Sequence, residues 1–138
     1  MSTLYLKGLE GICNASLSWT ADTIKLTYMK TNYTPDSGVE QFYSDVSASV
    51  ATGAPTVTLA TKTVAPDATN FRVEFDAADV TSSTITTETD KFLIYKDTGL
   101  AATSPLIYCG DIGATLTPSA GTLGLTFNAE GIFAINDN

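Results

Sequence analysis

The sequence divides into short segments in which apolar and polar residues alternate, each bounded by residues that favour turns. In residues 24–29, Ile, Leu and Tyr alternate with Lys, Thr and Met, and residues 56–61, 71–75 and 123–127 repeat this period of two. A period of two places successive side chains on opposite faces of a strand, so each segment predicts a strand with one face turned inward. Residues 66–70 (Pro-Asp-Ala-Thr-Asn) predict a turn that joins two of these strands as a hairpin.

Other segments predict strands by composition rather than by alternation. Residues 91–96 are nearly all apolar between two lysines, which is typical of a strand covered on both sides, and residues 105–109 are expected to pair with them. A Thr-rich strand is expected around residues 84–86, and residues 131–135 are expected to form the last pair with the segment before them. About eight short strands with turns between them predict an all-β fold, an antiparallel β-sandwich or jelly roll.

One short helix is expected near the N-terminus, over residues 7–15. Leu6, Leu9 and Cys13 recur at helical spacing on one side of this segment, although two glycines inside it weaken the pattern. The fold class is therefore all-β with a short N-terminal helix or arm.

The length and apolar content fit a single domain. The chain has 138 residues, of which 43% are hydrophobic, enough to fill one core. We expect residues 1–22 to form an N-terminal arm or short helix packed on a β-sandwich domain of residues 23–138. Only 16% of the residues are charged and about one in six is threonine, a composition that loses little side-chain entropy when a partner covers it.

The charge balance argues against two classes of partner. The formal net charge is −8, and the seven basic residues form no cluster, whereas binding to nucleic acid requires a basic surface. The same sign opposes docking on anionic lipid, and no apolar run approaches the roughly 20 residues of a membrane span. The first residues lack a basic region followed by an apolar stretch, so we expect no signal peptide and synthesis in the cytoplasm.

The chain lacks the residues that most enzymes use. It contains no histidine, which removes imidazole bases, Ser-His-Asp triads and His-containing zinc sites. Its two cysteines, Cys13 and Cys109, are too few for a structural zinc site, and we expect them to be buried and reduced rather than bridged. No glycine-rich phosphate-binding motif is present. We therefore predict no enzyme activity, no catalytic residue, no cofactor and no metal.

Carboxylates are the remaining candidates for chemistry. Asp76 and Asp79 are close in sequence, and Asp90 and Asp97 flank the apolar segment 91–96. Paired acids in a cleft would suit glycoside hydrolysis, but nothing marks a cleft, and the loop pattern of a calcium site is missing. We expect these aspartates to cap turns by accepting backbone hydrogen bonds.

The aromatic residues separate into two groups. Five phenylalanines lie on the inward-facing positions of predicted strands and are expected in the core: Phe71, Phe75, Phe92, Phe127 and Phe133. Four other aromatics lie near loops or strand ends: Trp19, Tyr33, Phe42 and Tyr43. These four either pack at the edge of the core or anchor an interface, because aromatic residues are enriched at interfaces.

Several stretches together resemble a family of small structural proteins from tailed bacteriophages. They are Lys7-Gly8-Leu9-Glu10 with residues 20–26, residues 73–80 (Val-Glu-Phe-Asp-Ala-Ala-Asp-Val), residues 93–99 with residues 102–107, and residues 125–132. The most specific part is Tyr95-Lys96-Asp97-Thr98-Gly99 followed by Ala-Thr-Ser-Pro-Leu-Ile. The resemblance covers strands and turns over nearly the whole chain and carries no catalytic motif.

The resemblance implies a component of the virion, assembled in the host cytoplasm. The expected role is that of a head decoration (cement) protein, a homo-oligomer that binds the major capsid protein on the outer surface and stabilises the head. Two alternatives stay open: a tail or head–tail component of the virion, and a β-sandwich module that binds a receptor or carbohydrate through its loop aromatics.

Overall fold

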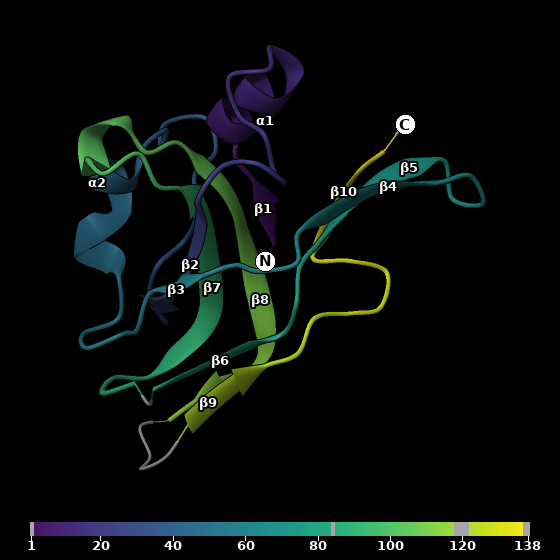
Figure 1. The fold of residues 1–138 in the computed structure, drawn as a ribbon. Coiled ribbons are helices and arrows are strands. Elements are labelled where there is room, and N and C mark those ends of the chain that lie inside the picture. Colours follow the sequence, from purple (N-terminus) through teal and green to yellow (C-terminus); the bar gives the residue numbers. More distant parts are fainter. Residues whose placement is uncertain (1, 84, 118–121, 137–138) are drawn as a thin grey trace.

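The computed structural model describes residues 2–83, 85–117 and 122–136. These residues form ten strands and four short helices (Figure 1). In chain order the elements are β1 (Thr3–Leu4), α1 (Leu6–Cys13), β2 (Ile24–Lys30), α2 (Tyr43–Val46), η1 (Ser47–Ser49), β3 (Val57–Thr58), β4 (Thr63–Asp67), β5 (Arg72–Asp76), β6 (Val80–Ser83), β7 (Thr89–Lys96), η2 (Ala101–Thr103), β8 (Leu106–Leu116), β9 (Thr122–Leu125) and β10 (Phe133–Asn136). No helix among the described residues is both long and apolar enough to cross a membrane.

The main sheet has five strands in the order β1-β8-β7-β2-β3, and every pair in it is antiparallel. The prediction that the segment 91–96 is a strand covered on both sides, paired with the segment after residue 105, is confirmed by β7 and β8. For β2 the prediction of one inward face is wrong. Thr27 and Met29 are as completely buried as Leu26 and Tyr28, because both faces of this central strand are covered.

Two smaller sheets complete the fold. One has the order β10-β5-β4, and the other pairs β6 with β9. The predicted hairpin is confirmed for its second strand, β5, but its first strand is β4 at residues 63–67 rather than the segment 56–61, and Pro66 and Asp67 belong to that strand rather than to the turn. The two last segments do not pair with each other, because β9 joins β6 and β10 joins β5. The strand expected at residues 84–86 lies earlier, at Val80–Ser83, and Ile85 is a buried loop residue; Thr84 lies outside the described part. The segment 56–61 contributes only the two residues of β3.

Two apolar clusters occupy the two faces of the main sheet. The larger joins β2, β7 and β8 to residues of β5, β6, β9 and β10, and includes Trp19, Leu26, Phe75, Phe92 and Phe133. The smaller lies under α2 and the chain around it: Tyr5, Met29, Tyr33, Val46, Leu93, Tyr95, Leu106 and Cys109. Strands face strands across the larger cluster, which confirms the expectation of an all-β, sandwich-like fold with a short N-terminal helix.

Helix α1 makes its closest approach to the sheet through its glycines, while Ile12 packs on the larger apolar cluster. Gly8 and Gly11 are its buried residues, whereas Leu6 is 59% exposed and Cys13 is exposed. A Cβ atom on Gly8 would lie 2.4 Å from the carbonyl oxygen of Leu106. The glycines that weaken the helical pattern in the sequence therefore permit the close approach of α1 to β8.

The two cysteines are free. Cys109 is buried in β8, and burial raises the pKa of its thiol to about 12, so this thiol stays protonated at neutral pH. The expectation that both cysteines are buried is wrong for Cys13, because the side of α1 that carries it faces solvent.

A buried hydroxyl chain ties the N-terminus to the loop after β2. The hydroxyl oxygens of Tyr5 and Tyr33 are 2.5 Å apart, and the Tyr33 hydroxyl donates to Glu40 Oε2 at 2.6 Å. The backbone N–H of Asp36 donates to the same carboxylate oxygen at 2.9 Å. Burial raises the pKa of both tyrosines far above its usual range, because the phenolate would lose its hydration. Both tyrosine hydroxyls in this hydrogen-bonded chain are therefore kept in their neutral form.

Alkaline pH is expected to destabilise the fold, because burial raises the pKa of all six tyrosines. A tyrosine that ionises near pH 10 when unfolded and higher when folded contributes its full stability below pH 10. That contribution is lost as the pH rises toward the folded value, about 12 for Tyr95. Urea unfolding at pH 8 to 11 is expected to give a free energy of unfolding that falls above pH 10, and less steeply in Tyr95→Phe. If the free energy of unfolding falls equally steeply with pH in Tyr95→Phe and in the unmodified protein, ionisation of Tyr95 does not contribute to the alkaline destabilisation.

Candidate interaction surface

Two of the four aspartates considered for catalysis accept backbone hydrogen bonds. Asp97 Oδ1 accepts the N–H of Gly99, and its other oxygen lies 2.6 Å from Lys25 Nζ, whose hydrogen bond lowers the pKa of Asp97. Asp79 Oδ1 accepts the N–H of Phe127. The predicted role as a turn cap is confirmed for Asp97, whereas Asp79 accepts a backbone hydrogen bond from a segment distant in sequence.

The two other aspartates are not turn caps either. Asp90 forms an ion pair at 2.6 Å with the neighbouring Lys91. Asp76 ends β5, and its buried Oδ1 has no hydrogen-bond partner in the described part of the chain. No group of three acids, cysteines or histidines suited to a metal occurs among the described residues. The prediction that the chain is not an enzyme stays a prediction.

Two of the four predicted interface aromatics lie inside the molecule. Trp19 is 3% exposed and Tyr33 is 7% exposed, and each belongs to an apolar cluster. Trp19 packs edge-on against Phe75 and Phe133, and its indole N–H donates to the carbonyl oxygen of Asp76 at 2.9 Å. Trp19 and Tyr33 have no ring face to offer a partner, so packing in the core is the correct interpretation for both.

The other two, Phe42 and Tyr43, are half-buried at the start of α2. Lys7 Nζ lies 5.5 Å from the centre of the Phe42 ring, and Tyr43 stacks on Tyr95 at 4.4 Å. Their role as interface anchors stays a prediction, since part of each ring remains accessible.

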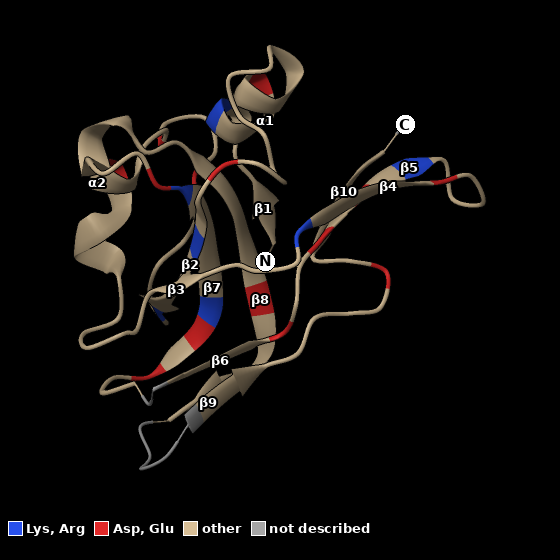
Figure 2. Cartoon of the chain, in the orientation of Figure 1, with Lys and Arg blue, Asp and Glu red and all other residues tan. Residues whose placement is uncertain are grey.

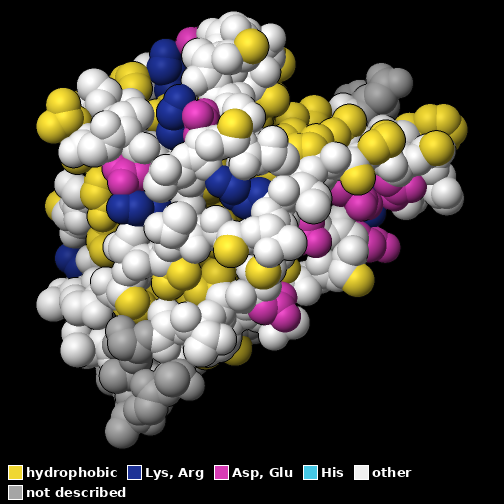
Figure 3. Space-filling view, in the orientation of Figure 1, with side chains coloured by type: hydrophobic (Ala, Val, Ile, Leu, Met, Phe, Trp, Pro, Cys, Tyr) yellow, Lys and Arg dark blue, Asp and Glu magenta, His cyan; other side chains and the backbone are white. Residues whose placement is uncertain are grey.

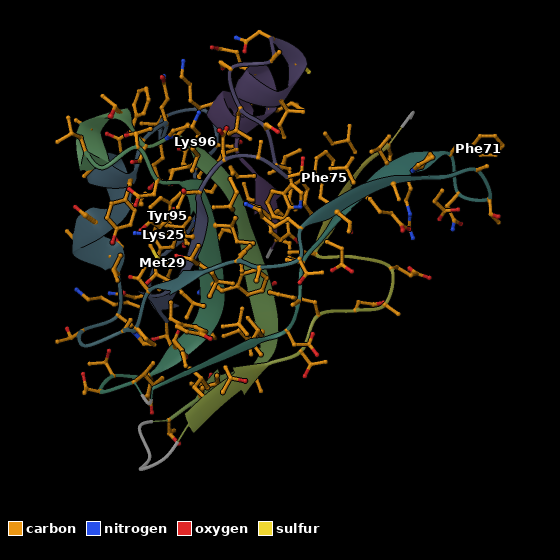
Figure 4. All side chains as sticks on the ribbon, in the orientation of Figure 1. Lys25, Met29, Phe71, Phe75, Tyr95 and Lys96 are labelled. Atoms are coloured by element: carbon orange, nitrogen blue, oxygen red, sulfur yellow. The ribbon has the colours of Figure 1, made fainter. Side chains whose placement is uncertain are left out.

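A more exposed surface lies on the sheet formed by β4, β5 and β10, which we call the projecting sheet. It extends away from the main sheet (Figure 1), and Phe71 lies at its far end (Figure 4). Strand register places Val64 beside Phe75, and both Pro66 and Ile135 beside Val73. Residues paired across a sheet share a face. One face of the projecting sheet is therefore apolar throughout: Val64, Pro66, Val73, Phe75, Phe133 and Ile135.

This apolar face is buried at its base and exposed at its edge and toward the turn. Phe75 and Phe133 stack on each other at 4.7 Å, and Phe133 stacks on Tyr108 at 5.1 Å. Val64, on the edge strand β4 opposite Phe75, is 44% exposed, and Val73, nearer the turn, is 38% exposed. The stacked rings fix the base of the sheet, so its far half is presented in a defined position.

Phe71 stands at the end of the turn between β4 and β5 with 73% of its surface exposed. Its φ is +52°, in the left-handed region that glycine and asparagine tolerate and bulky residues avoid. Asp67 Oδ1 accepts the N–H groups of Thr69 and Asn70, which fixes the turn. A large apolar residue here is unfavourable both in backbone conformation and in solvation. Such a combination makes this position a candidate contact site.

A shallow hollow lies on the far half of the apolar face, and Pro66, Phe71, Val73 and Ile135 contribute to its lining. Figure 3 shows hydrophobic side chains gathered along the projecting sheet, with acidic side chains below them. We define the exposed apolar patch as Val64, Pro66, Phe71, Val73 and Ile135.

Strand register places Asp67, Arg72 and Glu74 on the opposite face of the projecting sheet; Figure 2 colours the charged residues along the chain. Arg72 Nη2 lies 2.8 Å from Glu74 and 3.0 Å from Glu130, and its Nε lies 3.3 Å from Asp67. Hydrogen bonds from Asn70 and nearby backbone N–H groups, together with Arg72, hold the pKa of Asp67 below its usual range. Three carboxylates against one guanidinium give these four residues a formal charge of −2.

The sequence pattern does not reveal the exposed apolar patch. Alternation of apolar and polar residues shows which side chains share a face of a strand, but not whether another part of the chain covers that face. The prediction that Phe71 belongs to the core is wrong: the residue lies in the turn, not on the strand. Phe75, Phe92 and Phe133 are buried as predicted, and Phe127 is half-buried against the same cluster. The usable signal was a phenylalanine directly after the turn residues Pro66 to Asn70, where glycine would suit the backbone better.

No protein-family model, no curated protein and no solved structure matches the chain.

Proposed function

We propose that the protein is a structural attachment module that docks on a protein assembly through the exposed apolar patch of the projecting sheet. The observation that carries this proposal is Phe71, a bulky residue held in the left-handed region and 73% exposed at the tip of a sheet whose base is fixed by stacked rings. Burial of such a patch by a partner is favourable, and the fixed base reduces the ordering cost of binding.

The assembly that we propose is the head of a tailed bacteriophage, with the major capsid protein as the partner. The sequence resemblance to phage structural proteins supports this choice. The weakly charged, threonine-rich composition suits a protein that is covered by others at little entropic cost. Contacts repeated over many capsid sites would stabilise the shell, even where each contact is weak.

The alternative of a receptor- or carbohydrate-binding module has lost part of its support. Trp19, Tyr33, Phe42 and Tyr43 were its candidate stacking faces, and the first two are buried. A tail or head–tail location remains the competing proposal within the virion.

Counting the protein in purified virions tests the proposed role. Quantitative mass spectrometry against the major capsid protein is expected to give a copy number of the same order as that of the capsid subunits. A number comparable to that of tail subunits would reject decoration and favour the tail, and a number near zero would reject any role in the virion.

A further inference from the structure

The projecting sheet has two faces of opposite chemical character, and the side chains of Asp67, Arg72 and Glu74 on the charged face are each about one-fifth exposed. In β5 the apolar face carries Val73, and the other face carries Arg72 and Glu74. The strand paired to it, β4, is exposed along most of its length, and the Glu130 side chain beside the charged face is 67% exposed. A partner surface that contacts only one face would leave the other in water.

We infer that the far half of the projecting sheet inserts into a cleft that has one apolar wall and one basic wall. This inference rests on the proposed attachment function and specifies the chemistry of its partner. The exposed apolar patch would pack on the apolar wall. The carboxylates of Asp67, Glu74 and Glu130 exceed the single charge of Arg72 by two, so a wall rich in lysine or arginine complements them.

A second copy of this chain does not offer such a cleft. The chain carries a net charge of −8, so two charged faces brought together would repel. Four of its six lysines already form ion pairs with acidic side chains of the same chain: Lys7, Lys25, Lys91 and Lys96. The prediction of a homo-oligomer is unaffected, but the projecting sheet would not be its contact.

The partner site that fits this sheet is the junction between two neighbouring subunits of a protein shell. A cleft between subunits has two separate walls, and a sheet inserted in it contacts both subunits at once. Insertion would therefore oppose separation of the subunits, which gives a decoration protein a physical means of stabilising the shell.

The test compares two double variants with the same net charge. Glu74→Gln with Glu130→Gln removes two charges from the charged face. Glu10→Gln with Glu88→Gln removes two charges elsewhere; Glu10 resembles Glu130 in being an exposed carboxylate with one basic partner. Association of each variant with empty head shells of the virus that encodes the chain would be measured at 20 mM and at 500 mM salt. Urea unfolding would confirm that both variants are folded.

At low salt we expect association to slow about tenfold in the Glu74/Glu130 variant and to change by less than twofold in the Glu10/Glu88 variant. The difference should vanish at high salt, where exposed charges are screened. If the unmodified protein binds the shells and the two variants associate at equal rates, the two-walled cleft is wrong and the attachment function is retained. No binding of the unmodified chain would reject the attachment function itself. If the free protein forms dimers and the Phe71→Asn variant is monomeric, the apolar patch contacts a second copy of the chain instead.

Discussion

Replacing Phe71 with asparagine is expected to weaken attachment to the shell at least 30-fold while the free protein loses no stability. An apolar anchor at the centre of an interface commonly contributes 2 kcal/mol or more, which corresponds to this factor. In the free chain the same side chain is 73% exposed and makes little packing contact. Asparagine tolerates the left-handed backbone, so the free energy of unfolding is expected to stay unchanged or rise by up to about 1 kcal/mol.

Two further variants separate the possible causes of weaker attachment. Leu100→Asn removes another large exposed apolar residue, 67% exposed and outside the projecting sheet, and is expected to leave binding unchanged. Val73→Thr keeps the β-branched shape within the patch but adds a hydroxyl, and is expected to weaken binding. Equal binding by Phe71→Asn and the unmodified protein in a sedimentation assay with empty shells would contradict the role of the patch.

Gly8→Ala is expected to destabilise the fold by about 3 kcal/mol, measured by urea unfolding. The added Cβ would lie 2.4 Å from the carbonyl oxygen of Leu106 and 2.7 Å from the Cα of Ile107, so helix α1 must move away from β8. Both contacts are to backbone, which cannot turn aside as a side chain can. The intrinsic helix preference favours alanine over glycine by about 1 kcal/mol, so a loss of stability identifies the close approach as the cause.

Gly124→Ala provides the matched control for this prediction. Gly124 lies in β9, has no positive φ, and has no atom within 4 Å of its would-be Cβ. Its replacement is expected to change the free energy of unfolding by less than about 1 kcal/mol. A similar effect of the two substitutions would contradict the packing account of α1.

Periodicity in the sequence predicts the secondary structure because local physics determines it. The alternation at residues 71–75 and the apolar run at residues 91–96 each specify a strand. These expectations are confirmed because a strand that buries apolar side chains must place them at fixed intervals.

Long-range packing decides what periodicity leaves open. Met29 alternates with core residues of β2 yet is buried, because α2 and the chain around it cover the second face of the main sheet. Val64 and Val73 alternate as core residues do, yet are 44% and 38% exposed, because nothing in the described chain covers the projecting sheet at these two positions. Trp19 comes from a loop but fills the space beside Phe75. Each outcome depends on segments distant in sequence.

A density map of the virion head with the protein bound tests the central claim most directly. We predict that the projecting sheet enters the junction between capsid subunits, with Phe71 in contact with an apolar surface and Glu130 facing basic side chains. A map in which this sheet points into solvent, while α1 or the main sheet contacts the shell, would contradict the claim.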